Sequence, residues 1–268
     1  MSGRTVTEAW VRRFHPSPDH AWRLACFAHA GGAASAFHQL SARLGPAAEA
    51  LCLQYPGRHD RHAEPFLTEV RLMADQAHEA LRAWRGPDER PLALFGHSMG
   101  AIVAFEVALR MEAEGLPAAH LFVSGRRAPS THRDERVHLR DDNGLVKEIL
   151  ALGGTEPEVL ADASVRKLIL PVVRNDYTAI ETYRCPSVAL LDRTPVTALV
   201  GESDPKATLD EVGAWADHTA DDFGLRVFGG GHFYLADRAA EVATAVTEAL
   251  SVGRAAPVEA LSAGRAVL

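Results

Sequence analysis

The sequence predicts an α/β protein, in which a mostly parallel sheet is covered by helices on both faces. Short apolar runs alternate with helix-like segments along much of the chain, and strands joined by crossover helices form parallel sheets. Residues 126–185 interrupt this alternation, because they contain only helix-like segments. A chain of 268 residues is long enough for one large domain with a substantial core.

The strands are predicted from short apolar runs bounded by turn residues. They cover residues 23–27, 50–54, 92–95, 120–125, 196–200 and 225–228, with one further short strand around 10–14.

The helices are predicted where apolar residues recur at helical spacing. They cover residues 68–84, 99–113, 142–152, 157–161, 165–183, 209–219 and 239–250. We expect Pro171 to kink or divide the helix at 165–183, because proline removes a backbone hydrogen bond and crowds the preceding turn.

The domain organisation follows from these elements. We expect one domain over residues 1–251 and a disordered tail over 252–268, which is rich in alanine with Gly and Pro. The helical stretch 126–185 is interpreted as a lid over the strand ends, the alternative being an elaboration of the helix layer.

Composition restricts the class of protein. The content of 47% hydrophobic and 24% charged residues is typical of soluble globular proteins, and the net charge of −7 argues against general nucleic-acid binding. No apolar stretch is long enough to predict a membrane span or an export signal. The three cysteines are far apart and lack metal-site spacing, so we expect reduced thiols, no metal and a cytoplasmic protein.

A candidate nucleophile, Ser98, lies in the sequence Gly96-His97-Ser98-Met99-Gly100. Apolar residues 92–95 precede this motif and an alanine-rich helical segment follows it, which gives the strand, turn and helix that a G-x-S-x-G nucleophile requires. Such a turn exposes the serine oxygen at the carboxyl end of a strand. The alternative is an ordinary strand-to-helix turn of small residues.

Asp204 and His232 are the candidate partners of Ser98. Each follows a predicted strand, so both belong to loops at the same edge of the sheet. Serine needs a neighbouring base, and a carboxylate fixes the tautomer of that base. The order Ser98, Asp204, His232 is that of the α/β-hydrolase fold. The rival acids are less suitable: Asp192 precedes its strand and Asp176 lies in the presumed lid.

The backbone N–H groups of Ala30 and Met99 are the candidate oxyanion hole. Ala30 lies in a small-residue loop after the first convincing strand, and Met99 follows the nucleophile at the helix start. His29 and His97 flank this site, and we expect them to shape it through hydrogen bonds rather than to act as bases.

Several motifs together resemble the type II thioesterases, the free-standing editing hydrolases of polyketide synthase and nonribosomal peptide synthetase systems. The resemblance covers about residues 20–250 and rests on the segments Phe27-Ala28-His29-Ala30-Gly31-Gly32, Tyr55-Pro56-Gly57-Arg58, Gly96-His97-Ser98-Met99-Gly100, Ser124-Gly125-Arg126-Arg127-Ala128-Pro129, Leu170-Pro171-Val172-Val173-Arg174-Asn175-Asp176 and Gly231-His232-Phe233. The chain departs from the family pattern at His29, where an aromatic residue often stands, and at Asn175, where a small residue is usual.

The resemblance implies an α/β-hydrolase that removes aberrant or stalled acyl groups from the phosphopantetheine arm of acyl or peptidyl carrier proteins. It implies Ser98, Asp204 and His232 as the triad, Ala30 and Met99 as the oxyanion hole, and no metal or bound cofactor. We expect a monomer. Arg126, Arg127 and Arg133 could meet an acidic carrier or form a solvated basic turn. The alternative functions are an acyl-CoA thioesterase or carboxylesterase with the same triad, and a non-catalytic ligand-binding protein of the same fold.

Overall fold

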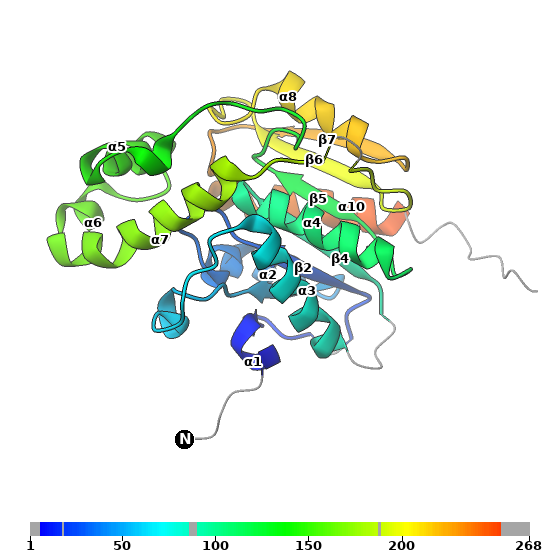
Figure 1. Cartoon of the computed structure of the whole chain (residues 1–268). Helices are drawn as coiled ribbons and strands as arrows, with labels where there is room; N and C mark the ends of the chain where they lie inside the picture. The colour runs from blue at the N-terminus through cyan, green and yellow to red at the C-terminus, as the bar shows by residue number, and fades with distance from the viewer. Residues whose placement is uncertain (1–5, 18, 86–89, 187–188, 253–268) are drawn as a thin grey trace, which may run out of the picture.

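The computed structural model describes residues 6–17, 19–85, 90–186 and 189–252, and these form a seven-stranded sheet with helices on both faces (Figure 1). The strand order is β1-β3-β2-β4-β5-β6-β7. Strand β1 is antiparallel to β3, and all the other neighbouring pairs are parallel, so the predicted fold class is confirmed. The strands are β1 (Val11–Arg12), β2 (Trp22–Phe27), β3 (Ala48–Leu53), β4 (Leu92–His97), β5 (Leu121–Ser124), β6 (Val196–Gly201) and β7 (Phe223–Phe228).

The helices cover the sheet from both sides, with α3 and α4 in front of it and α10 behind it in Figure 1. The short helices α1, α2 and α9 were not predicted, and the segment predicted at 209–219 is α8 followed by a 3-10 helix, Ala214–His218. The α-helices are α1 (Val6–Trp10), α2 (His38–Arg43), α3 (Val70–Arg85), α4 (Met99–Ala113), α5 (Asp142–Leu152), α6 (Pro157–Ala161), α7 (Ala163–Thr182), α8 (Leu209–Gly213), α9 (Tyr234–Asp237) and α10 (Ala239–Val252).

The core lies on both faces of the central strands. Every residue of β3, β4, β5 and β6 is buried, as the continuous apolar runs predict for a parallel sheet. Helix α4 is buried along almost its whole length, which explains its small side chains: alanine and glycine allow the helix to lie close to the strands. This tight contact fixes the position of the turn that joins β4 to α4.

The insertion, residues 126–185 between β5 and β6, contains α5, α6 and α7, which extend together to one side of the sheet (Figure 1). It has a small core of its own, formed by Val137, Leu145, Leu170 and Val173. Of the two predicted effects of Pro171, a kink or a division of the helix, the division does not occur, because α7 (Ala163–Thr182) continues through the proline. The buried side chains on both sides of the proline, Leu170 and Val172 among them, offset the hydrogen bond that proline cannot make.

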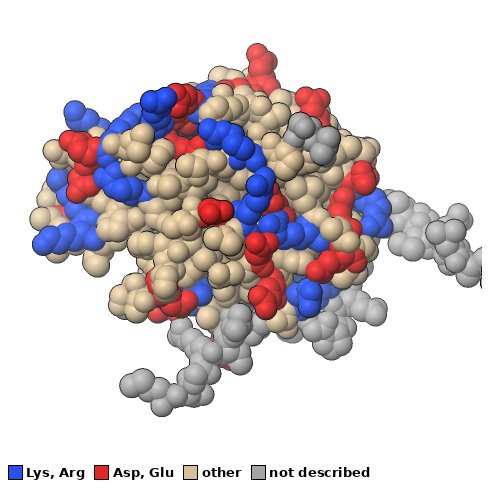
Figure 2. All heavy atoms as spheres, in the orientation of Figure 1, with Lys and Arg blue, Asp and Glu red and all other residues tan. Residues whose placement is uncertain are grey.

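Three further features concern the predicted class of protein. Among the residues that the structure describes, no helix is long and apolar enough to cross a membrane, and no group of His, Cys, Asp and Glu side chains is arranged to hold a metal ion. Acidic and basic side chains are interspersed with uncharged ones on the face seen in Figure 2. Helix α10 extends through Val252, and the rest of the predicted tail, 253–268, lies outside the described residues.

Candidate active site

Ser98 occupies a sharp turn between β4 and α4. Its backbone has φ 55° and ψ −117°, a conformation that residues with side chains rarely adopt. The flanking glycines permit this turn: a Cβ atom on Gly96 would lie 2.1 Å from the carbonyl oxygen of Gly100, and one on Gly100 would lie 2.0 Å from the carbonyl oxygen of Phe27. The strain and the close packing both hold the serine at the carboxyl end of β4.

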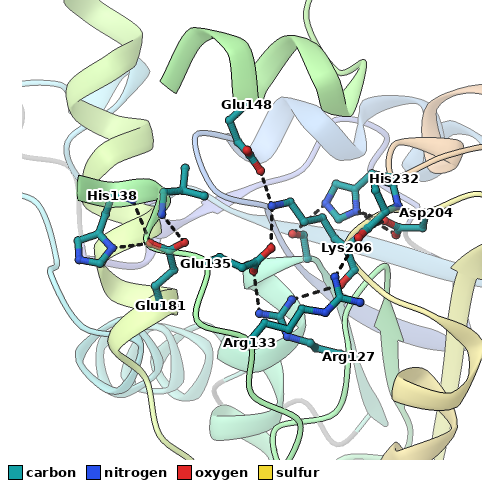
Figure 3. Close-up of polar contacts among 12 residues, drawn as sticks. Arg127, Arg133, Glu135, His138, Glu148, Glu181, Asp204, Lys206 and His232 are labelled. Atoms are coloured by element: carbon teal, nitrogen blue, oxygen red, sulfur yellow. Dashed lines mark hydrogen bonds and ion pairs between the residues drawn. The ribbon is translucent and has the colours of Figure 1, made fainter. Parts of the chain in front are cut away.

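Ser98, His232 and Asp204 are joined by hydrogen bonds. Figure 3 shows the contact between His232 and Asp204. His232 Nε2 lies 3.0 Å from Ser98 Oγ, and His232 Nδ1 lies 3.0 and 2.9 Å from the two carboxylate oxygens of Asp204. The backbone N–H of Lys206 donates to Asp204 Oδ1 at 2.8 Å. Since a carboxylate only accepts hydrogen bonds, Asp204 holds the proton of His232 on Nδ1 and leaves Nε2 to accept from the serine.

Neither rival acid contacts His232. The backbone N–H of Asp192 donates to Glu112 on α4, away from the serine. Asp176 is fully buried, but its carboxylate is bound to Arg58 and to the backbone of Gly31. The structure therefore brings Asp204, and not its rivals, to the histidine.

Ala30 and Met99 line a small cavity together with Ser98 and His232. Met99 is the first residue of α4, so its N–H is one of those that a helix leaves without an internal partner. Among the described residues, no hydrogen bond occupies the N–H of Ala30. Both predicted donors thus lie beside the serine with the N–H of Ala30 available to a ligand.

This small cavity, of about 20 Å³, is also lined by the charged side chains of Arg126, Glu135, Glu181 and Lys206 and by Tyr177 and Ile180. Arg126 lines it, and within the described part of the chain the buried Nε of Arg126 has no hydrogen-bond partner. Burial, reinforced by the charge of Arg127, lowers the pKa of Arg126 to about 9. Burial works to raise the pKa of Glu135, but Lys206 and Arg127 outweigh it and lower that pKa to about 2.

A charged cluster joins the insertion to the turn that carries Asp204 (Figure 3). Lys206 Nζ pairs with Glu135 Oε1 at 3.0 Å and with Glu148 of α5. Arg127, which is buried, pairs with Glu135 at 2.8 Å, and Arg133 pairs with Glu211. Arg127 and Arg133 are therefore engaged within the protein, which does not support the expectation that they meet an acidic partner.

A larger cavity, of about 600 Å³, also borders His232. It is lined by His29, Phe37, His97, His232, Phe233 and the segment 152–154 of the insertion. His232 therefore lines both cavities, while Ser98 lines the smaller of the two.

His29 and His97 are neutral over the physiological pH range. Burial, together with the charge of His232, lowers the pKa of His29 to about 3 and that of His97 well below its usual value. His97 Nδ1 is hydrogen-bonded to Ser124 Oγ at 2.9 Å, and Ser124 is bonded in turn to the hydroxyl of Tyr234 at 2.6 Å. The ring centroid of His97 lies 5.2 Å from that of His232. The hydrogen bonds from His97 through Ser124 to Tyr234 therefore hold a ring that packs beside His232.

The sequence analysis did not predict a role at the site for Lys206, Ser124 or Tyr234. What could have indicated such a role is their position, because each lies within two residues of a predicted strand end or of a candidate site residue. Their partners are far away in the sequence, and only the folded sheet brings them together.

A strained serine at the end of a central parallel strand, bonded to a histidine and an aspartate from two later strand ends, defines the α/β-hydrolase class. The family model described as "Thioesterase domain" matches residues 22–250. The chain therefore belongs to the thioesterase domain family, and it is a thioester hydrolase.

Two curated relatives are identical to this chain at about half of the aligned positions. The "Probable cadicidin biosynthesis thioesterase" of Streptomyces griseus is 49% identical over 248 residues, which are 92% of this chain and 68% of the relative. "Thioesterase PikA5" of Streptomyces venezuelae is 48% identical over 250 residues, which are 92% of this chain and 88% of the relative.

Solved structures of type II thioesterases are also similar to this chain, both in sequence and in fold. The type II thioesterase BorB from the borrelidin biosynthetic cluster is 42% identical, with a TM-score of 0.82 over 93% of this chain and 100% of that one. YbtT, a type II thioesterase from the yersiniabactin pathway, is 31% identical, with a TM-score of 0.81 over 91% of this chain and 99% of that one. The resemblance to type II thioesterases seen in the sequence is thus confirmed.

Proposed function

We propose that this thioesterase hydrolyses acyl groups from the phosphopantetheine arm of carrier domains and so clears aberrant or stalled chains in polyketide or nonribosomal peptide biosynthesis. The observation that carries the proposal is the set of hydrogen bonds that joins Ser98, His232 and Asp204, in which His232 lines both cavities. The substrate class is supported by YbtT, a type II thioesterase that is named for an NRPS/PKS biosynthetic pathway.

The proposed reaction has two halves. Ser98 Oγ attacks the thioester carbonyl while His232 Nε2 takes the serine proton, and the N–H groups of Ala30 and Met99 bind the oxyanion. His232 then gives this proton to the departing pantetheine sulfur, which leaves an acyl group on Ser98. Water, deprotonated by His232, attacks this ester, and the returning proton restores the serine hydroxyl as the free acid leaves.

The two cavities differ in the room that they offer to the substrate. The departing sulfur must lie close to His232 Nε2, because that atom supplies its proton. The cavity of about 600 Å³ beside His232 has room for a pantetheine arm or an acyl chain, whereas the cavity of about 20 Å³ beside Ala30 and Met99 has room for about one water molecule and suits the oxyanion. In this arrangement the insertion is the lid of the site. The proposal includes action in the cytoplasm, as a monomer and without a cofactor.

The test compares hydrolysis of an acyl-phosphopantetheinyl carrier protein with that of the same acyl-CoA, using the wild type and Ser98→Ala. We expect the wild type to release free acid faster from the carrier than from CoA, and Ser98→Ala to release none above background. Equal rates on both thioesters, or faster hydrolysis of the CoA thioester, would favour the acyl-CoA thioesterase alternative. Cleavage of simple oxygen esters alone would contradict the proposed substrate class while leaving the triad in place.

A further inference from the structure

The loop that carries Ala30 is bound to the insertion by a buried carboxylate. Asp176 of α7 is fully buried, and its Oδ2 accepts a hydrogen bond from the backbone N–H of Gly31 at 2.8 Å. Arg58 donates to both carboxylate oxygens, at 2.7 and 2.9 Å, in the two-pronged geometry that guanidinium and carboxylate groups favour. Arg58 also donates to the carbonyl oxygen of Gly32 at 2.9 Å. The pair thus holds residues 31 and 32 directly.

Steric contact fixes the same loop from the same helix. Gly31 has a positive φ of 79°, which glycine adopts easily, and a Cβ atom there would lie 2.6 Å from Cγ2 of Val173. Helix α7 therefore packs against the backbone of Gly31 as well as accepting its N–H. The position of the peptide that joins Ala30 to Gly31 depends on where α7 lies.

The hydrogen bonds of Asp176 are all used for holding this loop. Besides Gly31 and Arg58, only Asn175 donates to its carboxylate among the described residues, at 3.1 Å, and Asn175 also donates to the carbonyl oxygen of Leu67 at 2.9 Å. A buried charged pair is costly to form unless every oxygen is satisfied, and here every oxygen is. Since the carboxylate contacts neither Ser98 nor His232, its effect on the reaction must pass through the loop.

We propose that Asp176 and Arg58 are positioning residues of the oxyanion hole, which couple the placement of the insertion to the placement of the Ala30 N–H. The inference rests on the proposed function of Ala30. In this arrangement the hole is formed only while α7 lies against the loop, so movement of the insertion away from the sheet disassembles it. The lid then controls the chemical step as well as access.

The test is Asp176→Asn, which keeps the shape of the side chain but replaces one accepting oxygen by a donor. Removal of one oxyanion donor typically lowers kcat by about 10²–10³-fold. Because Asp176→Asn displaces the Ala30 N–H rather than deleting it, we expect kcat to fall about 10-fold to 100-fold, with KM within about two-fold. A boronic acid that forms a tetrahedral adduct on Ser98 should lose affinity by a similar factor.

Glu49→Gln is the matched control. Glu49 is a buried carboxylate at the start of β3, at the opposite edge of the sheet, and it accepts from Arg13 Nε at 2.6 Å. This variant loses the charge of a buried carboxylate without touching residues 29–32, so its kcat and boronic acid affinity should stay near those of the wild type. Arg58→Lys, which keeps the charge but not the two-pronged contact, should lower kcat in the same direction as Asp176→Asn.

The outcomes separate the two proposals. The inference is overturned if Asp176→Asn and Arg58→Lys retain kcat, if they raise KM alone, or if boronic acid affinity does not change. Boronic acid binding needs no turnover of a carrier substrate. A wild type that binds it more tightly than Asp176→Asn but hydrolyses no carrier-bound acyl group would contradict the proposed substrate and leave the positioning role intact.

Discussion

Replacement of His97 by asparagine should make the protein less sensitive to mild acid. His97 is 1% exposed, and burial together with its neighbours His232 and His29 lowers its pKa well below 6.5. In the unfolded chain its pKa returns to about 6.5, so between these two values the unfolded state binds a proton that the folded state does not. Stability therefore rises with pH in this window and falls as the solution is acidified.

The magnitude follows from the linkage relation. With an unfolded pKa of about 6.5 and a folded form that stays neutral, acidification from pH 6.5 to pH 5 lowers the free energy of unfolding by about 2 kcal/mol through this residue alone. His97→Asn cannot take up that proton, and its amide can still reach Ser124 in place of Nδ1. The smaller side chain of asparagine lowers stability at both pH values. The prediction therefore concerns the change in the free energy of unfolding between pH 6.5 and pH 5, compared between the two proteins.

The assay is urea denaturation at pH 6.5 and pH 5, followed by tryptophan fluorescence, which the buried Trp215 should make sensitive to unfolding. The wild type should lose about 2 kcal/mol more than His97→Asn between the two pH values. An equal loss in both proteins would refute the reasoning, because it would mean that His97 is protonated in the folded state.

Three further changes test other contacts. Gly100→Ala should cost at least about 3 kcal/mol of unfolding free energy, since its Cβ would lie 2.0 Å from the Phe27 carbonyl oxygen; an unchanged melting temperature would contradict this. The low pKa of Glu135 stabilises the fold above its ordinary value of 4.5, and this contribution is lost as the pH falls towards about 2. Glu135→Gln should therefore lose less stability than the wild type in urea titrations between pH 4.5 and pH 3, and parallel losses would argue against the ion pairs. Tyr234→Phe removes the 2.6 Å hydrogen bond to Ser124 and should cost about 1–3 kcal/mol in urea denaturation, whereas a neutral effect would mean that water replaces the hydroxyl.

The sequence was most informative where a residue and its environment lie close together in the chain. Ser98 is recognisable because its strand, turn and helix are consecutive. Asp204 and His232 are recognisable because each follows a strand, and the carboxyl ends of parallel strands meet at one edge of the sheet. These local signals predict that all three side chains lie at one edge of the sheet, and in the structure the three side chains are hydrogen-bonded there.

Contacts between distant residues gave no such signal. Asp176 and Arg58 are 118 residues apart, and nothing near either residue indicates the other. The short helices α2 and α9 are too brief to show a helical period. At Pro171 local geometry predicts a kink or a division of the helix, and burial of the surrounding residues keeps the helix undivided. In each case the local structure depends on packing against residues that are distant in the sequence, so local propensity does not predict it.

Lys206 limits how this enzyme can be re-engineered. Its ammonium joins Glu135 to Glu148 of α5, while its backbone N–H holds the carboxylate of Asp204. Lys206 also lines the small cavity beside Ser98, so a substitution that reshapes this cavity alters the support of Asp204, the acid that orients His232. A loop transplanted from a homologue should therefore bring its own counterparts of Lys206 and of the two glutamates that Lys206 contacts.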